Sequence, residues 1–486
     1  MRSPHLFKSF TVLALFCLNL QAEVIQPAEL RASIDELRAM VISQQKQIQI
    51  QQEQITILQA QVDGRGRQSR EDQSYGISED HGGEVVSSAG EGGIPGRRPT
   101  SSDALVESKI PVVKGVSENF VTSKFGAEFY GYLKTDVIFT SQDVSLDTVP
   151  LFVRQRNGSN DDGQFNMSAK ESRFGAKLKG PDIGSGALTG LVEFDFYGDF
   201  SDISARHAYK LRSRQLYVNY GNEDWSILAG KSWETYLSVF PQLVNFSSYN
   251  LMGQLGMRKE QLRFTKNYTI DEQSKITVKV ALAEPLGGIH GGDLDEDGVD
   301  DGAESDLPNF EYLIAYSLPM LTDQPSTFAL SGFYGEEKTG TTQLGADKKF
   351  ESYAFIAGLT FPITEKLLLK GTLWTGTNLD AAWGGIGQGI NLLKGETIDA
   401  TGGWAQLGYQ ATDKLKLNLG YSFDDPQDSD LNIGDRSKNS SFLVNGFYSF
   451  SPNFILGFEY MRLETGYYGE KDEAADWLQS SLIYKF

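Results

Sequence analysis

One segment of the chain carries acidic residues at the spacing of a calcium-binding loop. The ligand positions of such a loop would be filled by Asp293, Asp295, Asp297, Val299, Asp301 and Glu304. Gly298 stands where the calcium loop needs a sharp turn, Val299 would offer its backbone carbonyl, and Glu304 would bind through both carboxylate oxygens. Asp300 occupies a position that is usually apolar, and no helical pattern flanks the segment. The sequence nevertheless predicts a Ca2+ site here.

Other segments place cations on one face of an alternating pattern, opposite apolar side chains. These cations are Arg173, Lys177, Lys179, Arg212, Arg214, Lys259 and Arg263. A ladder of such groups attracts carboxylates, and arginine grips them through two hydrogen bonds. Arg212 and Arg214 share the alternation of Leu216 and Val218, so they join the polar face only where a bulge intervenes or where they precede the strand.

The alternative interpretation is that each cation pairs with a carboxylate of the same wall. The candidate carboxylates are Glu128, Asp136, Glu193 and Asp195.

Residues for catalysis are scarce. Apart from His5 the chain has His81, His207 and His290, and it contains neither a Gly-x-Ser-x-Gly nucleophile motif nor a His-x-x-x-His metal pair. We therefore expect a protein that is not an enzyme, the alternative being an enzyme that uses His207.

The elements that would position these residues are strands. From about Phe125 to Phe486, apolar and polar residues alternate in segment after segment. Sixteen segments are expected, at about 125–137, 172–180, 188–197, 211–220, 225–233, 259–268, 275–283, 309–317, 327–335, 351–361, 367–375, 403–411, 415–423, 440–449, 454–463 and 477–486.

The connections between these strands alternate in length. Those after odd-numbered strands are long, as at 141–170 and 284–308, and those after even-numbered strands are short, as at 364–366 and 412–414. An even number of strands with short turns at one end and long loops at the other is the plan of an outer-membrane barrel. The sequence thus predicts an all-β fold, a 16-stranded antiparallel transmembrane β-barrel. In this topology the acidic loop lies outside the cell, where its alternative role is to share divalent ions with lipopolysaccharide.

The last strand alternates Leu478, Leu482, Tyr484 and Phe486 out to the C-terminus. This ending resembles substrates of the barrel-assembly machinery, which we expect as a partner during biogenesis.

The connection 234–258 is unusually apolar for a loop, with members such as Tyr236, Phe240, Val244 and Leu251. Exposed apolar loops promote aggregation, so we expect this loop to fold into the barrel and narrow a pore. The alternative is packing within a trimer.

The first 120 residues differ in composition from the barrel. Residues 1–22 read as a secretory signal peptide, too short in its apolar run to span a bilayer, and the lone Cys17 lies within it. Residues 23–63 form an α-helical coiled-coil segment in which Ile34, Val41, Ile48, Ile55 and Val62 recur every seven residues. Residues 64–120 are a flexible linker, and 121–486 are the barrel. A helix packed on its own domain is the alternative to the coiled coil, whose heptads alone favour a dimer.

The charge balance limits the partners. Lys and Arg number 44 against 64 Asp and Glu, a net charge of −20. This argues against a sequence-independent nucleic-acid binder, which needs a basic surface.

The order of these parts resembles the DcaP-like trimeric porins of Gram-negative bacteria. Local stretches that carry the resemblance are 172–175, 191–198, 211–217 and 228–233, which contain Ser-Arg-Phe-Gly, Leu-Val-Glu-Phe-Asp-Phe-Tyr-Gly, Leu-Arg-Ser-Arg-Gln-Leu-Tyr and Leu-Ala-Gly-Lys-Ser-Trp. The resemblance implies a homotrimer in outer-membrane lipid that admits small, mostly anionic solutes such as dicarboxylates.

We therefore expect an outer-membrane porin for passive, anion-preferring diffusion, with the coiled coil in the periplasm. The alternative is a structural anchor that tethers the envelope through the coiled coil.

Overall fold

The computed structural model describes residues 126–156, 162–198, 209–285, 287–288, 292–340 and 346–486. The predicted signal peptide, coiled coil and linker lie outside these residues. The barrel strands are β1 (Gly126–Thr140), β5 (Arg173–Ile183), β6 (Gly186–Asp195), β7 (Arg212–Gly221), β8 (Trp225–Trp233), β9 (Arg258–Thr269), β10 (Lys275–Ala283), β11 (Asn309–Pro319), β12 (Pro325–Thr339), β13 (Lys348–Thr364), β14 (Leu367–Thr377), β17 (Asp399–Gln410), β18 (Leu415–Pro426), β19 (Arg436–Ser451), β20 (Phe454–Tyr467) and β21 (Glu473–Lys485).

Shorter elements lie in the connections. They are β2 (Val144–Leu146), β3 (Val149–Val153), β4 (Gln164–Ser168), η2 (Ala303–Ser305), η3 (Asp380–Ala382), η4 (Gly385–Gly387), β15 (Ile390–Asn391), β16 (Glu396–Thr397) and η5 (Asp428–Asp430).

The main sheet closes on itself as an antiparallel barrel of sixteen strands. Its seventeen elements include β4 and β5, which both pair with β1 at successive registers, so together they form one interrupted strand of the barrel. Closure is made by β1 with β21, from Tyr132 opposite Lys485 to Thr140 opposite Trp477. Because a closed barrel has no free edge, every strand can satisfy its backbone groups inside a bilayer. All sixteen predicted strands are confirmed.

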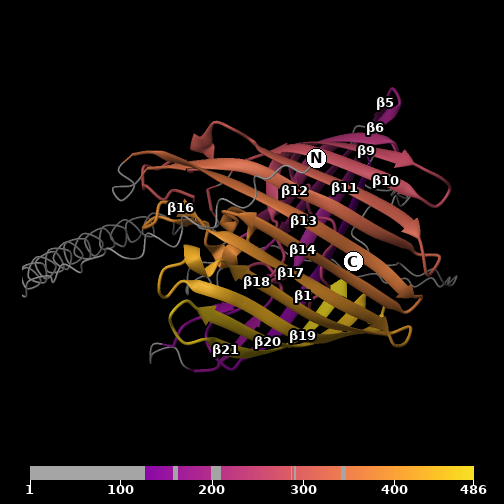
Figure 1. Cartoon of the computed structure of the whole chain (residues 1–486). Helices are drawn as coiled ribbons and strands as arrows, with labels where there is room; N and C mark the ends of the chain where they lie inside the picture. Colours follow the sequence, from indigo (N-terminus) through magenta and orange to yellow (C-terminus); the bar gives the residue numbers. More distant parts are fainter. Residues whose placement is uncertain (1–125, 157–161, 199–208, 286, 289–291, 341–345) are drawn as a thin grey trace, which may run out of the picture. The chain divides into compact units, whose positions relative to one another are not determined.

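The two ends of the barrel differ as the sequence predicted. Short turns such as 222–224, 365–366 and 452–453 join strands at one end, toward the right in Figure 1. The longer connections, including 234–257 and 284–308, leave from the opposite end. In the general plan of bacterial outer-membrane barrels, short turns are periplasmic and long loops are extracellular.

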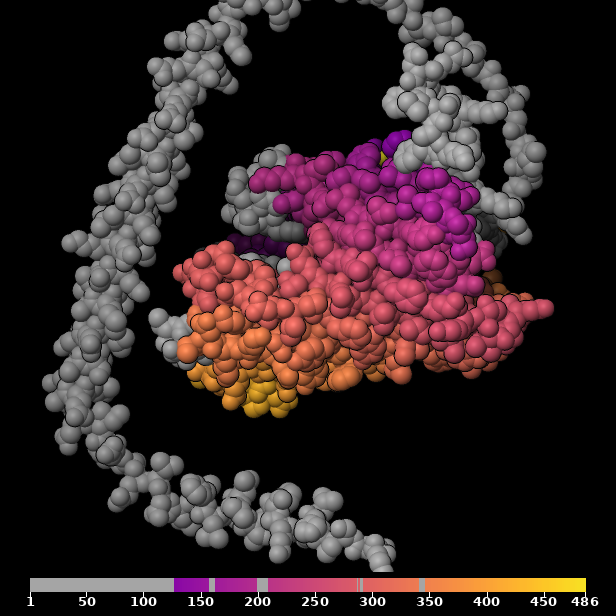
Figure 2. Space-filling model, turned by 90° about the horizontal axis from the view of Figure 1, so that it is seen from above, coloured from indigo at the N-terminus to yellow at the C-terminus, as the bar shows by residue number. Residues whose placement is uncertain are grey.

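Side chains alternate between an apolar outer face and a packed interior. Phe129, Leu330 and Phe355 point outward and are 78, 67 and 61% exposed, whereas Ala354 and Trp374 point inward and are almost fully buried. Figure 2 shows part of the outer face, where the magenta, orange and yellow segments lie next to one another in the order of the chain. No helix in the described part of the chain is long and apolar enough to cross a membrane.

The C-terminal residue completes the closure. Phe486 and Gly131 exchange two backbone hydrogen bonds of 3.1 Å, and the Phe486 ring lies 5.8 Å from that of Phe174. The terminal aromatic residue singled out in the sequence is therefore part of the seam between the first and last strands.

Leu330 provides a test of the lipid-facing assignment, because it lies opposite Ile314 and Ala357 well inside the strands β11, β12 and β13. We expect Leu330→Arg to lower the free energy of unfolding in lipid vesicles by about 2–4 kcal/mol, since the guanidinium would face hydrocarbon. Leu330→Phe is the control and should change little. Equal urea midpoints for the two variants would contradict the outward orientation.

Candidate functional site: the barrel interior

The connection 234–257 folds into the barrel. Tyr236, Val244, Tyr249, Met252 and Leu255 are each at most 1% exposed, although they belong to a loop. Glu234 and Met257 join the two ends of this loop. The Glu234 backbone N–H donates to the Met257 carbonyl at 3.1 Å, and the Glu234 carboxylate accepts from the Met257 N–H. The predicted constriction loop is confirmed in its location.

A wall carboxylate holds the far side of this loop. Glu459 of β20 is fully buried and accepts hydrogen bonds from Val244 N at 2.7 Å, Asn245 N at 3.1 Å and Asn245 Nδ2 at 2.6 Å. An ionised carboxylate can accept several hydrogen bonds at once, and hydrogen bonds to a charged acceptor are stronger than neutral ones. Glu459 therefore acts as an anchor for loop backbone that has no strand partner.

Other strands add polar contacts to the same loop. Gln406 of β17 accepts from Gln242 N at 2.9 Å, and Trp374 of β14 donates to the Gly253 carbonyl at 2.7 Å. From β1, Lys134 donates to the Val244 carbonyl at 2.6 Å. The loop thus begins at β8 and reaches strands of the barrel that are not next to β8, namely β1, β14 and β17.

Two further connections fold inward, which the sequence analysis did not anticipate. The β2–β3 hairpin reaches the inner side of β20, where Val153 N donates to Thr465 Oγ1 at 2.9 Å. Between β14 and β17, the carbonyls of Ala382 and Trp383 accept from Gly256 N at 2.7 Å and Leu251 N at 3.0 Å. The signal for both was present in their apolar residues, which include Val149, Leu151, Leu379 and Ile386, all buried.

Strained backbone is concentrated in these inward loops. Tyr249, Leu251, Trp383 and Ile386 have φ values of 63, 60, 63 and 52°. The left-handed conformation costs a residue with a side chain roughly 1–2 kcal/mol. Such residues persist where surrounding contacts determine the backbone, so the strain shows how tightly the loops are held.

On the β5–β9 side, the interior wall is basic. A register shift between β6 and β7 places Gln215 opposite Glu193 and Ser213 opposite Phe194, which leaves Arg214 as the extra residue of a bulge. Bulges re-aim side chains, and here the shift brings Arg212 to the same face as Asp195. The bulge that the sequence required for an inward arginine pair is present.

The arginine pair is bonded to wall carboxylates. Arg212 contacts both oxygens of Asp195 at 2.9 and 2.7 Å, and Arg214 contacts Glu193 and Asp195 at 2.8 Å each. Arg173 lies 3.9 Å from Glu193.

Aromatic rings separate these guanidinium groups. Phe246 of the constriction loop lies 5.6 Å from Arg212 and 5.7 Å from Arg214, and Trp233 lies 5.9 Å from Arg214 and 4.5 Å from Arg258. Cation–π contacts at such distances are favourable. Arg258, which the sequence analysis missed, joins the cluster without an ion-pair partner among the residues described.

The remaining predicted cations fall into two groups. Lys177 pairs with Glu128 at 3.5 Å, and Lys259 is buried and pairs with Glu234 at 3.1 Å. Lys179 and Arg263 have no carboxylate within 4 Å in the described ranges. Ion pairing, the alternative interpretation, therefore accounts for Arg173, Lys177, Arg212, Arg214 and Lys259.

Arg263 has a neighbour that the sequence analysis also missed. Lys279 of β10 stands opposite Thr265 of β9, Arg263 stands opposite Ala281, and the two cations repel one another. In the sequence, Lys279 could have been placed on the inner face from the alternation of Lys275, Thr277 and Lys279 along β10. Unpaired like charges at one place on an inner wall attract anions.

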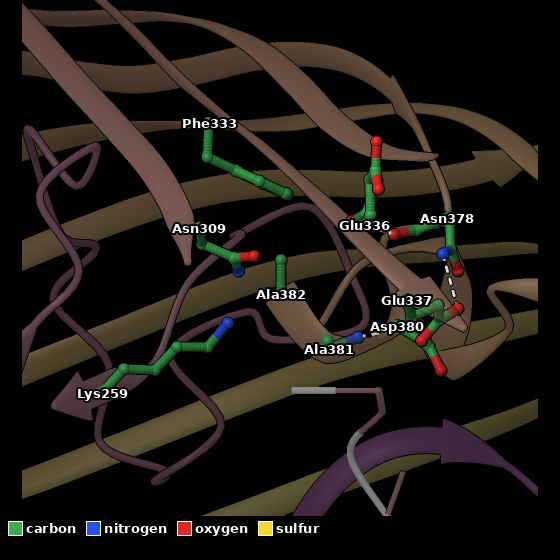
Figure 3. Close-up of a pocket in the computed structure, with 10 residues that line it drawn as sticks. Lys259, Asn309, Phe333, Glu336, Glu337, Asn378, Asp380, Ala381 and Ala382 are labelled. Carbon is green, nitrogen blue, oxygen red and sulfur yellow. Dashed lines mark hydrogen bonds between the residues drawn. The ribbon is translucent and has the colours of Figure 1, made fainter. Parts of the chain in front are cut away.

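A small polar pocket lies where the β14–β17 connection meets the wall. Figure 3 shows Lys259, Asn309, Glu337 and Asp380 around it, and Asn378 donates to Glu337 at 2.6 Å. Burial raises the pKa of Asp380 in η3 to about 6. The hydrogen bond between Asn378 and Glu337 links the β14–β17 connection to β12.

His5, His81, His207 and His290 all lie outside the described residues.

A closed sixteen-stranded barrel with an apolar outer face and a loop folded inside has the architecture of the outer-membrane porin folds. Among solved structures, the outer membrane channel DcaP of Acinetobacter baumannii matches with a TM-score of 0.59 and 18% identity, covering 74% of this chain and 97% of that chain. The resemblance noted in the sequence is confirmed for the fold.

Other similar structures are an anion-selective porin from Comamonas acidovorans (TM-score 0.49, 12% identity, 75% of this chain and 100% of that one) and a loop-deletion mutant of OmpT from Vibrio cholerae (0.48, 15%, 74% and 99%). No protein-family model matches the chain, and no curated protein matches it.

Glu459 offers a test of the constriction. Glu459→Gln would place an amide NH2 against loop N–H donors, and an unsatisfied buried group costs about 1–3 kcal/mol. We expect the loop to loosen, with single-channel conductance increased and current noise raised in planar bilayers. Glu464→Gln, an exposed neighbour on β20, is the control. Unchanged conductance and noise in a folded Glu459→Gln barrel would contradict the anchoring role.

Proposed function

We propose that this protein is an outer-membrane porin that lets small hydrophilic solutes diffuse passively, with a preference for anions such as dicarboxylates. The observation that carries the proposal is the division of charge inside the barrel. Carboxylates of the inner wall are occupied by loops or by cations, whereas Arg263 and Lys279 have no carboxylate partner in the described residues.

The wall carboxylates support this division one by one. Each has at least one oxygen bonded within the protein, as shown by Asp136, Glu193, Asp195, Glu311, Asp424 and Glu459. Each of these residues is at most 5% exposed, so its charge is withdrawn from water. A carboxylate solute would meet a wall whose remaining solvent-facing charges are mostly positive.

The net charge of −20 does not oppose this proposal. Many acidic residues belong to the long connections, including Asp293, Asp297, Glu304, Asp428 and Asp430. Interactions between exposed charges fade beyond a Debye length of about 8 Å at physiological ionic strength. The selectivity of a narrow pore depends on the groups that line it.

The surroundings follow from the same proposal. We place the barrel in the Gram-negative outer membrane, in contact with its lipid and lipopolysaccharide, as a homotrimer folded by the barrel-assembly machinery. The apolar outer face supports the membrane setting, and the assembly route rests on the alternation of the last strand, β21. The trimer rests on the family resemblance, and the periplasmic coiled coil rests on the heptads.

The test is ion selectivity in planar bilayers. Under a salt gradient we expect the reversal potential of the wild type to show anion preference, and Arg263→Gln combined with Lys279→Gln to lower the anion-to-cation permeability ratio several-fold. Lys438→Gln, whose side chain is half exposed and pairs with Asp425, is the matched control.

A silent barrel would contradict the porin proposal and favour the anchor. Cation preference in the wild type would contradict the basic lining while leaving the pore intact.

A further inference from the structure

The connection between β10 and β11 gathers five carboxylates into one cluster. Ligand oxygens of Asp293, Asp295 and Asp297 lie within 4.8 Å of one another, and so do those of Asp295, Asp301 and Glu304. Asp295 belongs to both groups, so the two sets of carboxylates adjoin at this residue. These are the side-chain positions that the calcium-loop spacing selected in the sequence.

Two carboxylate oxygens in this cluster are buried without a hydrogen-bond partner. Asp301 is fully buried, and while its Oδ2 accepts from Leu294 N at 3.0 Å, its Oδ1 has no partner in the described residues. Asp295 Oδ1 is in the same situation, although its Oδ2 accepts from Gly340 N at 2.7 Å.

No lysine or arginine of the described ranges lies within ion-pair distance of the five carboxylates. Two lysines of the neighbouring strands β12 and β13 are engaged elsewhere, since Lys338 pairs with Asp347 at 3.0 Å and Lys349 pairs with Glu336 at 3.3 Å. Buried charges in proteins are paired or coordinate a metal, so the protein leaves a negative site that its own cations do not neutralise.

The backbone of the acidic loop turns around the Asp293 carboxylate. Asp297 N and Gly298 N donate to the two oxygens of Asp293 at 3.0 and 2.9 Å, and Gly298 has a φ of 93° that favours glycine. The chain therefore bends around the carboxylates.

We propose that Asp293, Asp295, Asp297, Asp301 and Glu304, with the backbone carbonyl of Val299, bind one Ca2+ ion. Six to eight oxygen ligands at about 2.3–2.6 Å suit Ca2+, whereas Mg2+ demands a smaller octahedral cage and keeps its waters. An extracellular site of this kind has a dissociation constant of about 0.1–1 mM. This site goes beyond the proposed solute passage and does not depend on it.

The ion would fasten two parts of the barrel rim. Lys338 N donates to the Asp301 carbonyl at 2.8 Å, and Gly340 N donates to Asp295, so the acidic loop already contacts the end of β12. A cation bound by both Asp295 and Asp301 would stabilise the contact between the acidic loop and β12, and its positive charge would neutralise part of the negative charge of the outer rim.

Calorimetry on the full-length barrel, refolded in detergent without lipopolysaccharide and treated with a chelator, tests the proposal with Ca2+ itself. We expect one Ca2+ per chain for the wild type and at least a tenfold loss of affinity for Asp295→Asn. Asp306→Asn is the matched control, because it removes the same charge from the same loop, outside the cluster, at a φ of 65° that asparagine tolerates. It should bind like the wild type.

Several outcomes would overturn the site. No heat from the wild type, or equal affinities for Asp295→Asn and Asp306→Asn, would reduce it to a diffuse acidic surface. Mg2+ binding as tightly as Ca2+ would contradict the choice of ion. Glu304→Gln is a second cluster variant should Asp295→Asn fail to fold, and it should also lose at least tenfold in affinity.

Discussion

The interior of this barrel depends on hydrogen bonds between buried wall carboxylates and the backbone of loops that have no strand to pair with. Glu459 accepts from Val244 and Asn245, Glu311 accepts from Thr235, and Asp424 accepts from Ile386. A buried carboxylate without partners is costly, and so is a buried backbone N–H without an acceptor. Each buried carboxylate satisfies a buried backbone N–H, and the N–H satisfies the carboxylate. The wall and the inward loops therefore stabilise one another.

This constraint also determines the charge of the interior. Carboxylates that hold loops or arginines are withdrawn from water, so the acidic composition of the chain and the basic lining of its lumen are compatible. The arginine cluster is another example of charges satisfied within the wall. Arg212 and Arg214 share Asp195, and the rings of Phe246 and Trp233 lie against the guanidinium groups of Arg212 and Arg214, respectively. Cations such as Arg263 have no carboxylate partner within 4 Å among the residues that the structure describes.

The sequence predicted what depends on local pattern. Alternation with a period of two located the sixteen strands, and alternating loop lengths located the two ends of the barrel. The parity conflict of Arg212 and Arg214 with Leu216 anticipated a bulge, and the apolar content of 234–258 anticipated an inward loop. What it did not predict are contacts between distant parts of the chain, such as Glu459 with Val244, 215 residues apart. Nothing in the neighbourhood of either residue specifies which strand a loop will reach, and Lys279 gained its role only when β10 was placed beside Arg263.

The position of the constriction loop can be measured directly by disulfide trapping. A Cβ atom on Gly457 would lie 3.1 and 3.2 Å from the two methyl groups of Val244, which is close enough for a bridge between cysteines at these positions. In a Cys17→Ser background, we expect Val244→Cys with Gly457→Cys to cross-link in high yield on mild oxidation, as read by mass spectrometry. Val244→Cys with Gly408→Cys, whose Cβ would instead meet Asn418 and Lys416, should not cross-link. Failure of the first pair in a folded barrel, or equal yields for both, would contradict a loop held across the lumen by the wall of β20.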